Sequence, residues 1–264
     1  MTTGRYVRGL LRYAVGAWLV LGTGPTAVGQ LDFQYQRGNL TNPFSGERYY
    51  TSILTIQHAT GWKLGDSFFF MDIIDDGGND GFNDKDLYGE WYPTLSFGKM
   101  TGKQVKLGPI RDVALIGGIN FDADANFFKY LPGVRLSWKV PGFLFLNTDI
   151  TAFIDANSGA ASGGAPRTSN SFMVDANWAL PFKIGGQSFS VAGHAEYIGG
   201  TTDEFGNQNR WWILAQPQFT WDLGAALFGE ANQLMVGTEY QFWRNKLGTA
   251  HHDNVLQLLV IWRI

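Results

Sequence analysis

Residues 171–180 read SFMVDANWAL, and apolar and polar side chains alternate along this stretch. Successive side chains of an extended strand point to opposite faces, so Phe172 and Trp178 share one face while Asp175 and Asn177 share the other. Two kinds of protein show this pattern: a soluble sheet with one wet face, and a barrel wall between lipid and a water-filled interior. The rest of the chain decides between them.

Residues 1–29 have the layout of a secretory signal peptide. A start with three arginines is followed by an apolar core over about 14–21, and small residues precede the expected cleavage point. A membrane anchor is the alternative, but the apolar core is much shorter than the roughly 20 residues of a spanning helix. We therefore expect a mature domain over residues 30–264.

Charge and composition exclude several classes of protein. Without the signal peptide, which holds three arginines and no acidic residue, 17 basic and 23 acidic side chains remain, a net charge of −6. This charge argues against binding to nucleic acid. The chain has no cysteine, its aromatic share is 15%, and its charged share is 16%, against about 25% in typical soluble domains. An exported, aromatic-rich chain without disulfides or long apolar runs favours an outer-membrane β-barrel.

Alternating segments of about ten residues, separated by turn residues, recur along the mature chain. Twelve can be placed, an even number, as a closed meander with both ends on one side requires. We therefore predict an all-β fold, a 12-stranded antiparallel transmembrane barrel. The segments are 31–38, 48–59, 66–75, 86–98, 111–122, 127–139, 143–154, 169–182, 188–198, 210–222, 233–243 and 254–264.

The connections between segments differ in length and composition. Those after odd-numbered segments, such as 75–85 and 155–169, are mostly long and rich in Gly, Asn, Asp and Ser, whereas those after even-numbered segments, such as VPG (140–142), are mostly tight. Long external loops and short periplasmic turns are typical of outer-membrane barrels. Two connections are exceptions because they are longer than a hairpin needs, 98–110 and 223–232.

The faces of the segments also separate by polarity. Leu95 and Phe97 are expected on the lipid face of segment 86–98, and Leu258 and Trp262 on that of the last segment. Tryptophans near the segment ends, Trp178 and Trp262 among them, match the aromatic girdles of membrane interfaces.

Several stretches resemble the nucleoside-specific channel-forming (Tsx-like) outer-membrane porins and their OmpK relatives. They are FFFMDIIDDGGNDGF (68–82), YGEWYPTLSFGKMTG (88–102), PGVRLSWKVPGFLFLNTDITAF (132–153) and VGTEYQFWRN (236–245), and their order and spacing carry the resemblance over most of the mature chain. The resemblance implies a monomeric 12-stranded barrel with a narrow pore that admits nucleosides. The chain departs from the usual aromatic C-terminus by ending in Ile264.

The polar faces supply the candidate substrate-binding residues that would line the pore. Aromatic rings stack on nucleobases, and carboxylates and amides bond to ribose hydroxyls and base edges. Alternatively, several rings simply fill the interior of a small barrel. The candidates are Phe68, Phe70, Asp72, Tyr88, Glu90, Tyr92, Arg135, Phe145, Asn147, Asp149, Phe153, Asp175, Asn177, His194, Glu196, Trp212, Glu239 and Trp243.

Basic residues, an acidic loop and a histidine pair leave smaller questions open. Arg135 and Lys139 form either a basic ladder facing the carboxylates or structural ion pairs inside a wet barrel. The stretch 75–86 resembles a calcium loop but fails the EF-hand pattern, so an exposed acidic loop is expected. His251 and His252 lack a third ligand. No metal, cofactor or catalytic residue is expected, and the protein is not expected to be an enzyme.

We therefore predict an outer-membrane channel for passive uptake of nucleosides or similar small ring-bearing solutes. The alternative is a non-transporting barrel that acts as a surface receptor or a structural protein, and a secreted β-sandwich is disfavoured by the loop pattern. The expected partners are the lipid bilayer of the bacterial outer membrane, the small solutes, and the barrel assembly machinery through the C-terminal strand. A monomer is expected.

Overall fold

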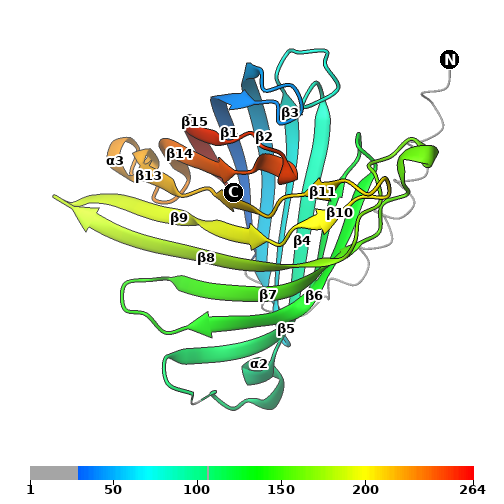
Figure 1. Ribbon diagram of the computed structural model, residues 1–264. Coiled ribbons are helices and arrows are strands. Elements are labelled where there is room, and N and C mark those ends of the chain that lie inside the picture. The colour runs from blue at the N-terminus through cyan, green and yellow to red at the C-terminus, as the bar shows by residue number, and fades with distance from the viewer. Residues whose placement is uncertain (1–28, 106) are drawn as a thin grey trace.

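The chain folds into one closed antiparallel β-barrel (Figure 1), seen in a computed structural model that describes residues 29–105 and 107–264. The expected signal peptide lies outside the described residues, apart from Gly29, which begins the first strand. The wall consists of β1 (Gly29–Thr41), β2 (Arg48–Gly61), β3 (Asp66–Asp75), β4 (Asp86–Ser96), β5 (Ile110–Asp122), β6 (Phe127–Trp138), β7 (Phe145–Asp155), β8 (Ser171–Ile184), β9 (Gln187–Ile198), β12 (Trp212–Ala215), β13 (Gln218–Asp222), β14 (Leu234–Arg244) and β15 (Asp253–Arg263).

The barrel closes between its first and last strands. Each strand pairs with its neighbour in sequence, and β15 pairs with both β14 and β1, so the blue and red ends of the chain lie side by side in Figure 1. The side chains of Arg263 and Asp32 join across this seam through two hydrogen bonds of 2.8 and 2.9 Å. Both β12 and β13 lie between β9 and β14 and form two halves of one strand. The predicted 12-stranded antiparallel barrel is therefore confirmed.

The tenth strand differs from its prediction because it is interrupted. Segment 210–222 was expected to be continuous, but pairing stops at Gln216 and Pro217. Proline has no backbone N–H to donate to the ladder. The register with β9 and β14 is the same on both sides of this gap, so the interruption inserts no residue and leaves the faces of the strand unchanged. Gly193 of β9 faces the interruption with φ of +144°, and a Cβ at this position would lie 2.2 Å from the carbonyl oxygen of Gln216. Only glycine fits this contact.

The two ends of the barrel are built differently. We call the end with connections 42–47, 76–85, 123–126, 156–170, 199–211 and 245–252 the loop end, and the end with the barrel's two termini the terminal end. Three small elements sit in the loop-end connections: η2 (Ala160–Ser162), the hairpin of β10 (Thr201–Thr202) and β11 (Gln208–Asn209), and η3 (Lys246–Gly248).

The two exceptionally long connections at the terminal end contain short helices, α2 (Phe97–Thr101) and α3 (Leu223–Leu227). The Ser96 side chain accepts a hydrogen bond from the Lys99 amide, so β4 ends in an N-cap and Phe97 begins a helix. The expectation that Phe97 continues the strand's lipid face is therefore wrong. Among the described residues, no helix has the length and apolar character needed to cross a membrane.

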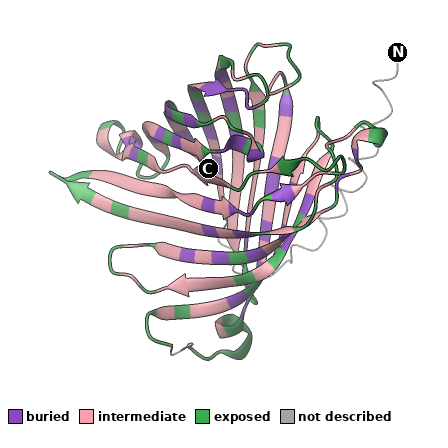
Figure 2. Cartoon of the chain, in the orientation of Figure 1, coloured by how far each residue is buried: buried purple, intermediate pink, exposed green. Residues whose placement is uncertain are grey.

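Buried and more exposed residues alternate along many of the strands, as the banding in Figure 2 shows. The exposed residues of the wall are largely apolar, whereas the buried ones are mixed. In β15, Leu258 is 56% exposed and Trp262 is 52% exposed, whereas Gln257 and Leu259 are fully buried. In β8, Phe172 is exposed while Asp175 is buried. A protein that exposes apolar residues over its whole wall and buries polar ones inside is solvated by lipid. The two solvents of SFMVDANWAL are therefore lipid and the barrel interior.

We predict that Leu258→Arg destabilises the barrel by about 2–4 kcal/mol, because it places a charge in the middle of the lipid-facing side of β15. Asn254→Arg on the same face is the matched control, since it lies at the loop end of the strand, where the cost falls to roughly 0–1 kcal/mol. Urea unfolding in lipid vesicles, followed by heat-modifiable mobility, measures both. Equal stability of the two variants would contradict the lipid-facing assignment.

Candidate functional site

The barrel contains a cavity of about 600 Å³ that reaches the terminal end. Its lining includes Gln30, Gly61 and Asp66, which lie at the terminal ends of β1, β2 and β3. No residue of the loop-end connections belongs to the lining. The cavity is therefore accessible from one end of the barrel.

Along one side of the cavity, hydrogen bonds connect side chains from β6 to β9. Arg135 of β6 donates two hydrogen bonds of 2.6 Å to the Asp149 carboxylate of β7. Asn177 of β8 donates to Asp149 at 3.3 Å and to Asp175 at 2.8 Å. Asp175 in turn lies 3.1 Å from Nδ1 of His194 on β9.

The same network continues to β14 and across the seam of the barrel. Nε2 of His194 lies 3.0 Å from the amide oxygen of Gln216, and Gln216 donates to Glu239 at 3.0 Å. Glu239 is 2% exposed and also accepts hydrogen bonds from Gln36 at 2.6 Å and Gln218 at 2.9 Å. We call Arg135, Asp149, Asn177, Asp175, His194, Gln216 and Glu239 the polar belt.

Ordinary strand alternation positions Gln216 within the polar belt, because it has the inward parity of Trp212 and Gln218. The backbone N–H of Gln216 donates to the carbonyl of His194 at 3.0 Å, and its side chain reaches inward between His194 and Glu239. The missing side chain of Gly193 makes the close approach of the two backbones possible. The interruption at Pro217 therefore leaves the network intact.

Strands β2 to β4 supply aromatic rings and further carboxylates to the cavity. The rings of Phe68 and Phe70 have centroids 6.1 Å apart. Thr55 donates to Asp72 at 2.5 Å, and the Tyr88 hydroxyl donates to Glu90. This part of the wall combines apolar faces with acceptors, the residue types used to hold ring-bearing polar solutes.

The cavity lining carries an excess of acidic groups. Seven carboxylates stand against two arginines and one histidine. Asp149 is paired to Arg135, and Asp66 is paired to Lys99 outside the lining. The low-dielectric wall focuses the resulting field into the cavity. The lining carboxylates are Asp66, Asp72, Glu90, Asp149, Asp175, Glu196 and Glu239, and the basic groups are Arg111, Arg135 and His194.

Packed apolar side chains adjoin the cavity toward the loop end. We call this cluster the loop-end plug: Tyr92, Ile116, Leu131, Phe153, Met173 and Ile198, with Phe68, Phe127 and Trp212 packed against it. Phe153 and Trp212 meet edge to face at 6.0 Å, and Leu131 is fully buried. A second apolar cluster, Leu40, Ile53 and Val255, lies inside the barrel near the same end.

Two buried lysines fasten the loop-end connections to the strands. Lys246 of η3 donates to Asp253 and to the carbonyl of Thr41, both at 2.7 Å, and its Nζ lies 5.0 Å from the Trp243 ring. Burial lowers the pKa of Lys246, although the nearby Asp253 carboxylate opposes this effect. Lys129 donates to Asp155 and to Thr168 in the same manner.

All the predicted pore residues point into the barrel, but they divide into two groups. Most line the cavity: Phe68, Phe70, Asp72, Glu90, Tyr92, Arg135, Phe145, Asn147, Asp149, Asp175, Asn177, His194, Glu196 and Glu239. Four do not. Tyr88 bonds to Glu90, Phe153 and Trp212 belong to the loop-end plug, and Trp243 lies beneath Lys246. Ring packing, rather than a pore surface, explains the last three.

Arg135 and Lys139 do not form a basic ladder. Arg135 makes an ion pair with Asp149, and Lys139 is an exposed residue beyond the end of β6. The ion-pair interpretation is therefore correct for Arg135.

The residues that sequence reasoning missed are mostly amides and lysines. Gln34 and Gln36 alternate with apolar residues in β1 and point into the cavity, a pattern visible in the sequence. Lys129 has the same parity as Arg135 and is also inward. Gln216 has the same inward parity as Trp212 and Gln218, so the alternation of its strand could have found it as well.

The acidic loop and the histidine pair have structural roles. In connection 76–85, the Asp84 carboxylate accepts hydrogen bonds from the backbone amides of Asp80 and Gly81, and Asp76 accepts one from Gly78. The His252 ring accepts a hydrogen bond from the Asn245 amide.

Comparisons with known proteins show no sequence relative. No known protein family matches the chain, and no curated protein is similar to it in sequence. Among solved structures, the chain is similar to the KdgM porin, with 7% identity and a TM-score of 0.48 over 88% of this chain and 98% of that one. It is also similar to an outer membrane channel from Pseudomonas putida F1, with 9% identity and a TM-score of 0.45 over 90% and 95% of the two chains.

A third solved structure is the transport unit of the autotransporter AIDA-I from Escherichia coli, with 10% identity and a TM-score of 0.30 over 94% of this chain and 96% of that one. The resemblance to Tsx-like porins stays a prediction. What this chain does is therefore inferred from its own residues.

We predict that Lys246→Met destabilises the barrel by about 3–5 kcal/mol, because it leaves the Asp253 carboxylate buried without its cation. The double variant Lys246→Met/Asp253→Asn should recover part of this loss. Urea unfolding of both singles and the double gives the coupling energy. If the losses of unfolding free energy in the two single variants simply add up in the double variant, the Lys246–Asp253 contact does not stabilise the loop end.

Proposed function

We propose that this barrel is an outer-membrane channel for small ring-bearing solutes that are neutral or cationic, nucleosides among them. The observation that carries the proposal is the polar, aromatic-lined cavity inside a wall whose outer face is apolar. An apolar outer face around a closed antiparallel barrel fits the bacterial outer membrane.

The size and lining of the cavity support a nucleoside-sized solute. Small-molecule sites typically enclose about 300–1,000 Å³, a range that includes this cavity of about 600 Å³. Phe68, Phe70 and Phe145 line it, and a base stacked on such a ring gains roughly 1–3 kcal/mol. Asn147 and Gln57 offer both a donor and an acceptor to hydroxyls and base edges. The resemblance to Tsx-like porins in the sequence agrees with this solute class.

The charge of the cavity selects against anions. Among the lining carboxylates, Asp72, Glu90 and Glu196 have no arginine or lysine in an ion pair with them among the described residues. A phosphate group would enter an already negative field, whereas an uncharged nucleoside would not be repelled. We therefore expect nucleosides to enter the cavity in preference to nucleotides.

Passage from one side to the other requires a change at the loop end. The loop-end plug lies between the cavity and the loop-end connections, so the structure corresponds to a closed channel. The connection 245–252 at the same end is fastened to β1 and β15 through the buried Lys246. A hydrophobic constriction of this kind can gate a pore by excluding water.

The closed loop end also favours a second candidate, a non-transporting barrel. If the loop-end plug never opens, the cavity is a binding vestibule and the loop-end connections serve as a receptor or structural surface. Conductance separates the two candidates.

We predict that Phe153→Ala/Trp212→Ala increases single-channel conductance in planar bilayers, because it removes the edge-to-face pair from the loop-end plug. The wild type should show small or intermittent currents. Phe172→Ala/Tyr197→Ala removes an aromatic pair with its centroids 5.7 Å apart from the outer face and serves as the control, with the wild-type conductance. Absence of current in both the wild type and the plug variant would support the non-transporting barrel.

We predict that Phe145→Ala weakens block of that current by adenosine roughly 5- to 100-fold, the equivalent of the 1–3 kcal/mol of one stacking contact. Adenosine monophosphate should block less well than adenosine in the wild type. The lipid-facing Phe172→Ala is again the control, since it changes a phenylalanine outside the cavity. If neither adenosine nor adenosine monophosphate alters the current, the barrel is still a channel, but nucleosides are not its solutes.

A further inference from the structure

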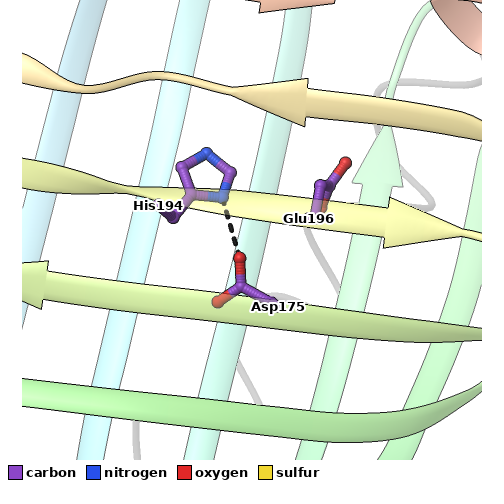
Figure 3. Close-up of side chains that lie close together, drawn as sticks. All are labelled: Asp175, His194 and Glu196. Carbon is purple, nitrogen blue, oxygen red and sulfur yellow. Dashed lines mark hydrogen bonds and ion pairs between the residues drawn. The ribbon is translucent and has the colours of Figure 1, made fainter. Parts of the chain in front are cut away.

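A histidine and two carboxylates converge on the wall of the cavity in an arrangement suited to a metal ion (Figure 3). Asp175 of β8 is directly opposite Glu196 of β9 in the strand register, and His194 precedes Glu196 by two positions on the same inward face. One potential ligand atom from each residue lies within 4.8 Å of those of the other two. The three groups come from the rigid wall of the barrel and not from a loop.

We infer that Asp175, His194 and Glu196 form a binding site for a divalent first-row transition-metal cation. This site is new relative to the sequence analysis, which expected no metal. The inference goes beyond the proposed function, because it does not require that any solute crosses the barrel.

The hydrogen bonds of Gln216 determine which nitrogen of His194 is free. Gln216 donates through its amide nitrogen to Glu239, so its amide oxygen is the atom that faces Nε2 of His194. An oxygen acceptor requires the proton on Nε2, which leaves the lone pair of a neutral imidazole on Nδ1. Nδ1 is the atom that faces Asp175.

Two acceptors therefore face each other unless a cation lies between them. Nδ1 of His194 and Oδ1 of Asp175 are 3.1 Å apart. That separation is filled either by a second proton on the imidazole or by a metal ion. Two ligand atoms 3.1 Å apart, each about 2.1 Å from a metal, subtend roughly 95° at it, an angle common in five- and six-coordinate sites.

Glu196 supplies an independent reason for a cation at this place. Its side chain is 9% exposed, and among the described residues it forms no ion pair with a lysine or arginine. By contrast, the carboxylate of Asp149 is paired to Arg135 at 2.6 Å. A largely buried carboxylate without a cationic partner is costly, and a metal ion would remove that cost.

The ligand set indicates the class of metal. One imidazole with two carboxylates suits Zn²⁺, Mn²⁺ or Fe²⁺, whereas Mg²⁺ and Ca²⁺ prefer oxygen ligands alone. Gln216 and Asn177 are the outer partners that orient the imidazole and the Asp175 carboxylate, as second hydrogen bonds do in protein metal sites. The coordination positions that protein atoms do not fill face the cavity.

Isothermal titration of the full-length barrel, folded in detergent and without an affinity tag, tests the site with ZnCl₂. The experiment is done in a His251→Gln/His252→Gln background, so that the loop histidines do not bind the metal. We expect one Zn²⁺ per barrel, and Mg²⁺ should not compete at equal concentration. His194→Gln and Glu196→Gln should each weaken binding at least tenfold.

Asp72→Asn is the matched control, since it neutralises a cavity carboxylate on β3 that lies outside the three-residue cluster. It should leave Zn²⁺ affinity within about twofold of the background variant. Heat-modifiable mobility verifies that each variant is folded. The inference is overturned if Zn²⁺ does not bind stoichiometrically, or if His194→Gln and Glu196→Gln bind it as tightly as the background variant. If Zn²⁺ does not bind, the outcome expected for the conductance experiments is unchanged, so the two proposals fail separately.

Discussion

The hydrocarbon part of a membrane offers no partner to a backbone N–H or carbonyl group, and the remaining features of this barrel depend on that constraint. Every wall strand is paired on both sides, and β15 meets β1 without an open edge. Even the interruption at Pro217 respects the constraint. The backbone amide of Gln216 donates to the carbonyl of His194, and the carbonyl of Pro217 accepts from the amide of Tyr240, so the interruption leaves few backbone groups unpaired.

The closure of the barrel also determines how charged and polar side chains find partners in its interior. Side chains that point inward cannot reach the bulk solvent along most of the barrel, so they bond to one another across neighbouring strands. Glu239 accepts four hydrogen bonds from glutamine side chains, a set that neutral donors can hold without a counter-ion. Because each strand contributes only one or two members, the polar belt exists only in the closed barrel.

Much of this wall could be predicted from the sequence, because side chains that point alternately to lipid and to the interior leave a pattern within each single strand. Eleven of the twelve predicted segments correspond to single observed strands within a few residues, and parity gave the inward face wherever one was assigned. The tenth strand was predicted as one segment but is interrupted at Gln216 and Pro217, where proline cannot donate to the ladder, although its register continues on both sides. The loop-end plug was also missed: Leu131 and Met173 lie on inward faces with polar residues, and only the three-dimensional curvature brings them together.

The two ends of the barrel differ in their access to the cavity. The cavity reaches the terminal end, beside the first residues of β1, whereas no residue of the loop-end connections lines it. In this closed state a molecule enters and leaves the cavity through the terminal end alone. The occupancy of the cavity therefore follows the solute concentration on that side of the membrane for as long as the loop-end plug stays closed.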